Sequence, residues 1–402
     1  MFVDYCTNTE LTGFSLFQKK GLQAISAIYT GECILEEQPL LCSQFLWNAE
    51  YKYAACEFCL APLETAEENV RRLSGDPTVS LPFTEQCCPT NKSAHVSCTC
   101  GVLFCTPECR QRAWDLYHRS LCPSEPSNAS TLGQSIEKLC NFWKTTHYPP
   151  ETASIMLLVK ILAAIKQSPS PMEMMAKVNE FTCSMGNSEE MIRKLLGEKY
   201  NEQIVNIRQM VGEIVFDPSL EPFFTDQGFT LLLALIFRHG QSIGTNPFSK
   251  WAENAERLVA SNPAKCEEIN KLVEQLFEKM DQKSGLQFIN NEGSGLYATS
   301  FHIRHSCDPN SELCFPHNNH VLQVKATTSI EPGEEITVCY LDECMQSSSR
   351  HTRVKYLQEN YSFTCHCRKC ESQIGQPDVT SDEEEEDSSD GEVYSDDDMN
   401  CD

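Results

Sequence analysis

The grouping of the cysteines constrains the fold of this chain most. Eight thiol and imidazole side chains fall at short spacings between residues 56 and 122: Cys56, Cys59, Cys98, Cys100, Cys105, Cys109, His118 and Cys122. Soft thiolates and imidazoles in groups of four hold zinc in closed tetrahedral sites. The pattern therefore predicts two zinc ions. Because the segment has little apolar content of its own, we expect metal binding to supply its folding energy.

Other uses of the cysteines fit the sequence less well. The first residues, Met1–Tyr5, contain no basic region followed by an apolar run, so no secretory signal is visible. We therefore expect a reducing compartment, cytoplasmic, nuclear or both, in which 23 cysteines do not form a disulfide framework. A redox dithiol would need a nucleophilic cysteine at a helix start in a thioredoxin-like context, which the sequence does not offer.

The charge of the chain is strongly negative and uneven. Of the formal net charge of −25, twelve negative charges fall in residues 381–402, which contain no lysine or arginine, so the preceding residues carry −13. A run such as Ser381–Asp387 cannot bury a core, and we expect a disordered tail that either contacts a partner or only increases solubility. The lack of a basic face argues against direct binding of nucleic acid.

No stretch reaches the roughly 18 apolar residues of a membrane helix, so we expect no membrane partner.

Three short signals follow one another in the last third of the chain. They are Arg304-His305-Ser306-Cys307, then Gly333-Glu334-Glu335-Ile336-Thr337-Val338-Cys339-Tyr340, then Cys365-x-Cys367-x-x-Cys370. The middle signal begins with a turn and continues with alternating apolar residues, which predicts a strand that delivers Tyr340 to its end. Taken alone, this piece also fits a surface hairpin with a core tyrosine. The last signal has three thiols and lacks a fourth ligand nearby in the sequence.

The first cysteine group resembles a MYND finger, including Trp114 ahead of the histidine. In that family the ligand pairs interleave. The resemblance implies one zinc on Cys56, Cys59, Cys105 and Cys109, and a second on Cys98, Cys100, His118 and Cys122. The family usually has two residues between the third and fourth cysteines, whereas Thr99 alone stands here. His95, Cys87 or Cys88 is therefore an alternative ligand in place of Cys98 or Cys100.

The later motifs resemble the catalytic end of a SET-domain lysine methyltransferase. The resemblance implies that Cys307 joins Cys365, Cys367 and Cys370 as the fourth ligand of a third zinc ion. It also implies that Tyr340 and Tyr361 are catalytic residues lining a lysine channel. Phe363 would stack on the adenine of S-adenosylmethionine, and the backbone of His305 would contact the same ring. Tyr361 and Phe363 are two residues apart, so both side chains are expected to face one pocket.

A turn near the N-terminus completes the cofactor site implied by the resemblance. Gly21 and Leu22 stand where SET domains contact the methionine end of the cofactor. Two positions differ from the family pattern: Lys19 replaces a glycine of this turn, and Arg304 replaces the asparagine before His-Ser-Cys. A guanidinium only donates hydrogen bonds. Arg304 could therefore reach the cofactor's carboxylate, but it cannot copy the acceptor role of an amide.

The order of signals predicts an α+β protein, namely a SET-type β fold split by an inserted finger and a helical insert and closed by a zinc cluster. The predicted parts are 1–50 (SET N-terminal part), 51–125 (finger with a long insert), 126–284 (helical insert), 285–345 (SET catalytic core), 346–372 (post-SET zinc cluster) and 373–402 (disordered acidic tail). The helical part follows from apolar residues at three- and four-residue spacing, as in Ile155, Leu158, Ile161, Leu162 and Ile165. This layout resembles the SET-and-MYND methyltransferases.

Two functions of different classes follow from these signals. The first is a monomeric protein-lysine N-methyltransferase that uses S-adenosylmethionine and acts on a basic protein such as a histone tail or a ribosomal protein. The alternative is a zinc-scaffolded adaptor with a SET fold and little or no turnover, which the replacements at Lys19 and Arg304 favour.

Overall fold

The computed structural model describes residues 9–11, 21–88, 90–146, 153–182, 188–285 and 289–376 of the 402-residue chain. The predictions for Lys19 and for the acidic tail from Ser381 lie outside these residues. The chain divides into two compact units, one formed by residues 1–304 with 309–338 and the other by residues 305–308 with 339–402. We call them the first and the second unit and describe each by itself.

Short strands provide the β structure. Their bounds are β1 (Thr9–Leu11), β2 (Leu22–Ala24), β3 (Cys33–Glu37), β4 (Leu41–Gln44), β5 (Val96–Ser97), β6 (Leu103–Phe104), β7 (Gln241–Thr245), β8 (Asn291–Leu296), β9 (Arg304–His305), β10 (Ser311–Cys314), β11 (Leu322–Ala326) and β12 (Glu335–Val338). Within the first unit, β2 pairs antiparallel with both β1 and β12. A second sheet has the order β10-β11-β3, and a third has the order β4-β8-β7. Strands from both ends of the chain therefore complete common sheets.

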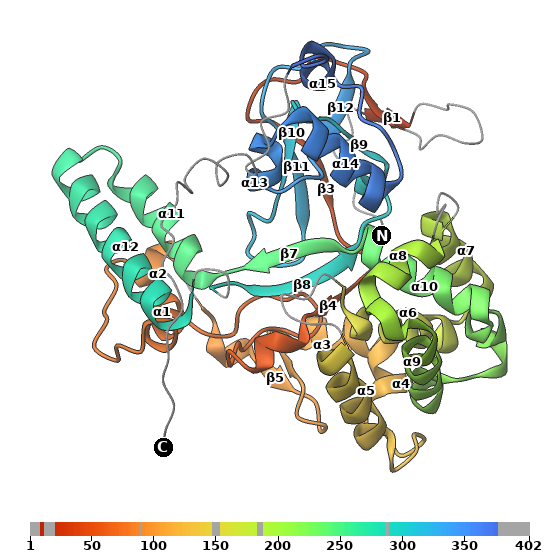
Figure 1. The fold of residues 1–402 in the computed structure, drawn as a ribbon. Coiled ribbons are helices and arrows are strands. Elements are labelled where there is room, and N and C mark those ends of the chain that lie inside the picture. The colour runs from red at the N-terminus through yellow and green to blue at the C-terminus, as the bar shows by residue number, and fades with distance from the viewer. Residues whose placement is uncertain are drawn as a thin grey trace, which may run out of the picture. The chain divides into compact units, whose positions relative to one another are not determined.

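Helices make up most of the described chain between β4 and β8. In the first unit they are α1 (Ala66–Ser74), α2 (Thr84–Cys87), α3 (Pro107–Ala113), α4 (Arg119–Leu121), α5 (Leu132–Thr146), α6 (Ile155–Gln167), α7 (Pro171–Thr182), α8 (Ser188–Leu196), α9 (Tyr200–Val215), α10 (Asp226–His239), α11 (Pro247–Val259) and α12 (Pro263–Ser284). In Figure 1, α1, α2, α11 and α12 gather near one end of the β7–β8 pair, and α6–α10 gather near the other end. The predicted helical insert is thus mostly helical, but it also contains β7, which the sequence reading missed.

Helix α6 forms the centre of the larger core. Ten of its residues, from Ile155 to Ile165, are buried, as expected for a helix that is apolar on all sides. The same hydrophobic cluster includes Phe58, Phe104 and Tyr117 from the segment that carries the first two cysteine groups. The apolar side chains of this segment therefore share a core with the helices, and the supply of its folding energy by metal binding stays a prediction.

The long insert between Cys59 and Cys98 packs into a separate core. Helix α1 begins with a capping box at Thr65, and α11 and α12 each begin with an asparagine cap followed by proline, which are strong helix-start signals. The indole N–H of Trp251 in α11 donates to the carbonyl oxygen of Pro82 at 2.7 Å. This contact and the shared apolar cluster tie the insert to α11 and α12.

The second unit is small and helical. It contains α13 (Glu343–Ser347), α14 (Arg350–Tyr361) and α15 (Arg368–Ser372), together with the loop at Cys307. Its core is formed by cysteines, Leu341 and Leu357. Among all described residues, no single helix is long and apolar enough to cross a membrane; one pair, Pro218–Phe224 with Asp226–His239, bent by 79°, reaches that length and composition together.

Candidate active site and metal centres

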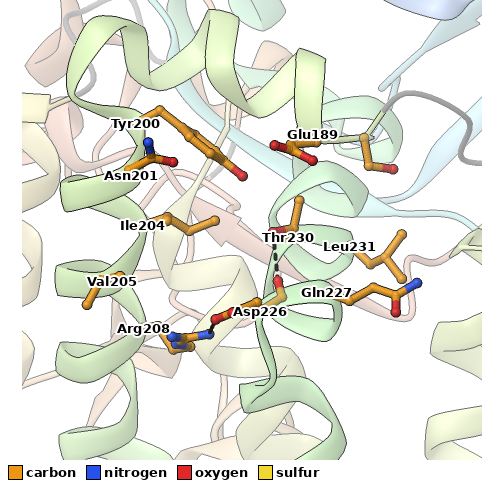
Figure 2. Close-up of a pocket in the computed structure, with 11 residues that line it drawn as sticks. Glu189, Tyr200, Asn201, Ile204, Val205, Arg208, Asp226, Gln227, Thr230 and Leu231 are labelled. Carbon is orange, nitrogen blue, oxygen red and sulfur yellow. Dashed lines mark hydrogen bonds and ion pairs between the residues drawn. The ribbon is translucent and has the colours of Figure 1, made fainter.

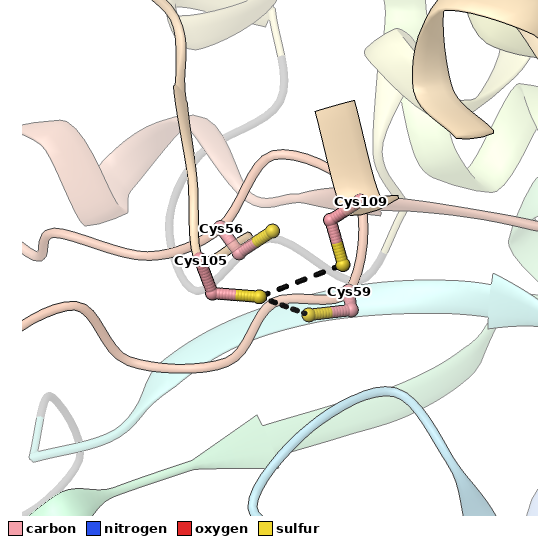
Figure 3. A group of neighbouring side chains, drawn as sticks. All are labelled: Cys56, Cys59, Cys105 and Cys109. Atoms are coloured by element: carbon pink, nitrogen blue, oxygen red, sulfur yellow. Dashed lines mark hydrogen bonds between the residues drawn. The ribbon is translucent and has the colours of Figure 1, made fainter. Parts of the chain in front are cut away.

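The first group of metal ligands consists of Cys56, Cys59, Cys105 and Cys109 (Figure 3), and it lies in the first unit. The sulfur of Cys105 is 3.6 Å from that of Cys59 and 3.5 Å from that of Cys109. Four thiolates about 2.3 Å from one zinc ion stand roughly 3.8 Å apart, whereas a disulfide would bring two sulfurs to about 2.05 Å. The spacing and the donor type therefore fit a zinc ion held by these four thiolates.

The second group joins Cys98, Cys100, His118 and Cys122. The sulfur of Cys98 lies 3.7 Å from that of Cys122, and the sulfur of Cys100 lies 3.5 Å from Nε2 of His118. Gly101, with φ of +92°, turns the chain directly after Cys100, so two cysteines separated by one residue reach the same centre. His118 ends a π-helical segment, Trp114–His118, between α3 and α4.

The alternative ligands left open by the sequence lie elsewhere in the described structure. Cys87 is buried in the core formed by α1, α11 and α12, and Cys88 and His95 are half-buried. None of the three belongs to a metal-ligand group among the described residues. The shortened spacing around Thr99 is therefore compatible with ligation by both Cys98 and Cys100.

The third group lies in the second unit and joins Cys307 to Cys365, Cys367 and Cys370. The sulfur of Cys307 is 4.0 Å from that of Cys365 and 3.6 Å from that of Cys370. These four thiols also fit a zinc ion. Cys307 lies 58 or more residues before the other three ligands in the sequence, and the fold brings all four together, as the resemblance to SET domains implied.

A buried arginine and a histidine lie beside this third group. The contact with the Cys365 thiol lowers the pKa of Cys307 most, and contacts with His305 and Arg353 lower this pKa further, against the effect of burial. Arg353 of α14 is 1% exposed, and its Nη2 donates to the side-chain oxygen of Gln373 at 2.6 Å and lies 3.8 Å from the sulfur of Cys370. Because four thiolates and one Zn²⁺ carry a net charge of −2, a buried guanidinium offsets part of it. The sequence reading missed Arg353.

Four predicted site residues gather in the second unit. The ring of Tyr340 is 5.1 Å from that of Tyr361, 5.3 Å from that of His305 and 6.3 Å from that of Phe363, measured between centroids. The hydroxyl of Tyr361 donates to the carbonyl oxygen of Tyr340 at 3.4 Å. The predicted catalytic tyrosines and the two aromatic cofactor residues of this unit therefore form one cluster.

The reason given for pairing Tyr361 with Phe363 needs correction. Tyr361 is the last residue of α14, so the two side chains do not alternate along a strand. Ser362 follows with φ of +59° and ψ of +35°, a left-handed conformation that ends the helix and turns the chain. The two rings still come within 6.4 Å of each other between centroids, but a helix end brings them together.

The other predicted cofactor residues, Gly21, Leu22 and Arg304, lie in the first unit. The guanidinium of Arg304 forms an ion pair with the carboxylate of Glu335 in β12 through Nε and Oε1. A Cβ atom built on Gly21 would overlap Oε1 of Glu335 and lie 3.0 Å from Nε of Arg304. The backbone at Gly21 thus lies directly against this ion pair. The strand pattern around Glu335 did not predict this role.

Leu22 plays a different part from Gly21. Its side chain is 1% exposed and its backbone pairs with Ile336 of β12. Any contact of Leu22 with a cofactor would therefore come from its backbone. The next residue, Gln23, donates from its side chain to the carbonyl oxygen of Gly333, which ties β2 to the turn before β12.

A buried lysine links the first metal group to the helical core, and the sequence reading missed it. Lys160 of α6 is 2% exposed, and its Nζ lies 2.5 Å from the carboxylate of Glu57, which stands between Cys56 and Cys59. The same ammonium donates to the carbonyl oxygen of Cys42 in β4 at 3.2 Å. Lys160 therefore joins the metal-binding loop, a strand and α6. Its only sequence signal was a charge within an apolar helical stripe.

The structure also has a pocket of about 670 Å³ among α8, α9 and α10 (Figure 2). Its polar lining includes Tyr200 and the ion pair between Arg208 and Asp226. None of the predicted site residues lines it. Its walls carry neither a metal-ligand group nor the aromatic cluster, so its size gives it no part in the predicted chemistry.

Comparison with known proteins adds to this geometry. A family model described as the SET domain matches residues 19–341. The chain is 44% identical over 369 residues to protein-lysine N-trimethyltransferase SMYD5 of Gallus gallus, covering 91% of this chain and 87% of that protein. It is 41% identical over 378 residues to SMYD5 of Homo sapiens, covering 94% and 89%. Histone-lysine N-methyltransferase SMYD3 of Homo sapiens is 40% identical over 93 residues, or 23% of this chain and 21% of that protein.

Proposed function

This chain belongs to the SET-and-MYND family of protein-lysine methyltransferases, and we propose that its substrates are lysine side chains of basic proteins such as histone tails or ribosomal proteins. The net charge of −25 supports a basic partner. The SMYD5 relatives are named trimethyltransferases, which supports a product that carries three methyl groups. We also propose that the protein acts as a monomer in the cytoplasm, the nucleus or both, without direct contact with nucleic acid or membrane.

The aromatic cluster of the second unit is the observation that carries the catalytic assignment. Each of the rings of Tyr340, Tyr361, Phe363 and His305 lies within 6.4 Å of at least two of the others, measured between centroids. When bound, S-adenosylmethionine supplies a methyl group activated by a sulfonium. Within this cluster we assign the contacts with the adenine of the cofactor to His305 and Phe363.

The residues of the cluster have to receive a neutral amine. A free lysine side chain has a pKa near 10.4, so it must lose a proton before it attacks. Burial among aromatic rings disfavours the ammonium and lowers the pKa of such a lysine. We assign to Tyr340 and Tyr361 the alignment of this amine through their hydroxyl groups and rings. Alignment of reacting groups contributes roughly 7–11 kcal/mol in well-oriented systems.

A methylation assay with the zinc-loaded full chain tests this proposal. Core histones and ribosomal proteins serve as basic substrates, an acidic protein serves as a comparison, and mass spectrometry counts the methyl groups on each lysine. Tyr340→Phe is expected to lower turnover at least tenfold while binding of S-adenosylmethionine persists. Tyr356→Phe, at a partly exposed position of α14, is the matched control and is expected to have no effect.

A different experimental result would contradict each part of the proposal. Equal turnover by Tyr340→Phe and the wild type would remove Tyr340 from the catalytic residues. Equal methylation of the acidic and basic proteins would contradict the substrate class. Binding of a partner protein that survives in Tyr340→Phe, with no methyl transfer by the wild type, would favour the adaptor function.

A further inference from the structure

Arg304 and Glu335 form a neutral charge pair at the start of β2. Glu335 of β12 stands opposite Gln23 of β2, so its side chain starts two positions from Gly21 in the sheet. Arg304 reaches the same place from the segment after β8 and pairs with Glu335 through Nε and Oε1. The missing side chain of Gly21 leaves the space that the pair fills, because a Cβ there would overlap Oε1 of Glu335.

Both side chains of the pair can form further hydrogen bonds. The side chains of Arg304 and Glu335 are 42% and 35% exposed, so a ligand can reach them. Among the described residues, their mutual ion pair is the only polar contact recorded for either side chain. A guanidinium offers five N–H donors and a carboxylate two oxygens. The pair therefore presents donors on terminal nitrogens and an acceptor oxygen side by side.

This arrangement complements an α-amino acid. The amino-acid end of S-adenosylmethionine carries a carboxylate and an ammonium on one carbon atom. Guanidinium groups bind carboxylates through strong charge-assisted hydrogen bonds, and a carboxylate accepts such bonds from an ammonium. Arg304 without Glu335 would instead add a full positive charge near the sulfonium. The carboxylate of Glu335 offsets that charge.

We infer that Glu335 is a cofactor-specificity residue that acts with Arg304: Arg304 donates to the carboxylate of S-adenosylmethionine, and Glu335 accepts from its ammonium. The inference rests on the proposed function for the identity of the cofactor. It gives the replacement of asparagine by Arg304 a positive role, since the charge pair takes over recognition of the amino-acid end. It also gives glycine at position 21 a role, because a Cβ there would displace the carboxylate of Glu335 from its present position.

Titration calorimetry with two ligands tests this inference. Zinc-loaded full chain is titrated with S-adenosylmethionine and with decarboxylated S-adenosylmethionine, which keeps the ammonium and the sulfonium but lacks the carboxylate. The wild type is expected to bind the decarboxylated ligand at least tenfold more weakly. Arg304→Met is expected to lose this discrimination, because its affinity for S-adenosylmethionine falls about tenfold and its affinity for the decarboxylated ligand does not fall.

Glu335→Gln gives the second arm. It leaves Arg304 unpaired and removes the acceptor, so the affinity for S-adenosylmethionine is expected to fall about tenfold. The affinity for the decarboxylated ligand, which has no negative charge, is expected to fall further. The double variant Arg304→Met with Glu335→Gln is expected to bind the decarboxylated ligand better than Glu335→Gln alone, because the uncompensated charge is gone. Glu334→Gln, at the neighbouring carboxylate, is the matched control and is expected to change neither affinity.

Several results would overturn the inference. Equal losses of affinity for both ligands in Arg304→Met would show that Arg304 does not contact the carboxylate of S-adenosylmethionine. A gain in affinity for S-adenosylmethionine in either single variant would show that the pair blocks the cofactor. A wild type that binds no S-adenosylmethionine would overturn it as well. Zinc content and melting temperature identify variants that fail to fold. No protein substrate is used, so failure to find a methylated lysine leaves this result unaffected.

Discussion

The backbone N–H of Tyr340 donates a hydrogen bond to Nδ1 of His305 at 2.9 Å. Nε2 of the same imidazole lies 3.2 Å from the sulfur of Cys307, a ligand of the third metal group. Because Nδ1 accepts, the proton of the neutral ring sits on Nε2 and can be shared with a thiolate. His305 therefore connects the metal group to the backbone of the proposed catalytic tyrosine, in addition to the contact with adenine that the family resemblance implies.

Replacing His305 with alanine tests this connection. Loss of the acceptor frees the backbone at Tyr340, and misplacement of a catalytic group by about 1 Å can cost roughly 100-fold in rate. We expect His305→Ala to lower kcat by about 10- to 100-fold, measured with saturating S-adenosylmethionine. His351→Ala, on the exposed side of α14, is the control. A change confined to cofactor affinity, with kcat retained, would show that His305 only binds the cofactor.

The three metal groups predict a zinc content. Plasma mass spectrometry of the purified chain is expected to find three zinc ions per molecule, one per group. Cys100→Ser and Cys370→Ser should each retain two, because a tetrahedral structural site that loses one thiolate binds zinc far more weakly. Cys87→Ser and His95→Ala should retain all three. Loss of zinc from either of these two variants would reinstate the alternative ligand sets that the sequence allowed.

The contact between Lys160 and Glu57 predicts a stability effect. Lys160→Met removes a buried ammonium and leaves the Glu57 carboxylate, 25% exposed, without its partner. Breaking a fully buried pair costs about 3–5 kcal/mol, and the partial exposure of Glu57 reduces the expected loss to about 2 kcal/mol. Chemical denaturation measures it, with Lys138→Met at the exposed pair with Glu213 as control. An equal effect of both substitutions would mean that the buried contact adds nothing specific.

Glu292 predicts a dependence of stability on pH. Burial raises the pKa of this β8 carboxyl to about 7 from its ordinary 4.5. Between these values the folded chain holds a proton that the unfolded chain has lost, so this group makes stability fall as pH rises from 4.5 to 7. Glu292→Gln removes that loss. Its melting temperature is expected to exceed that of the wild type at pH 8 and to match it near pH 4.5, whereas Glu267→Gln, at an exposed site, should show no such difference.

Local patterns predicted much of this molecule. The cysteine spacings predicted eight ligands for two zinc ions and a later group of three thiols, the family resemblance implied the pairing and Cys307 as the twelfth ligand, and the structure gathers those same side chains in three groups of four. Apolar periodicity predicted the buried helix α6, and alternation predicted β12. These predictions succeed because ligand type, helix period and strand period are properties of neighbouring residues, which a sequence displays directly.

The remaining features depend on contacts between distant segments. β7 lies within a region of helical pattern and becomes a strand because β8, some 46 residues later, pairs with it. The neutralisation of Arg304 required Glu335, 31 residues away, and the burial of Lys160 beside Glu57 joins residues 103 apart. The sequence by itself therefore determined the ligands, the periodic elements and the family. Only the tertiary structure decided which charges are paired and which carboxyls lose water, because burial and pairing depend on which segments meet in space.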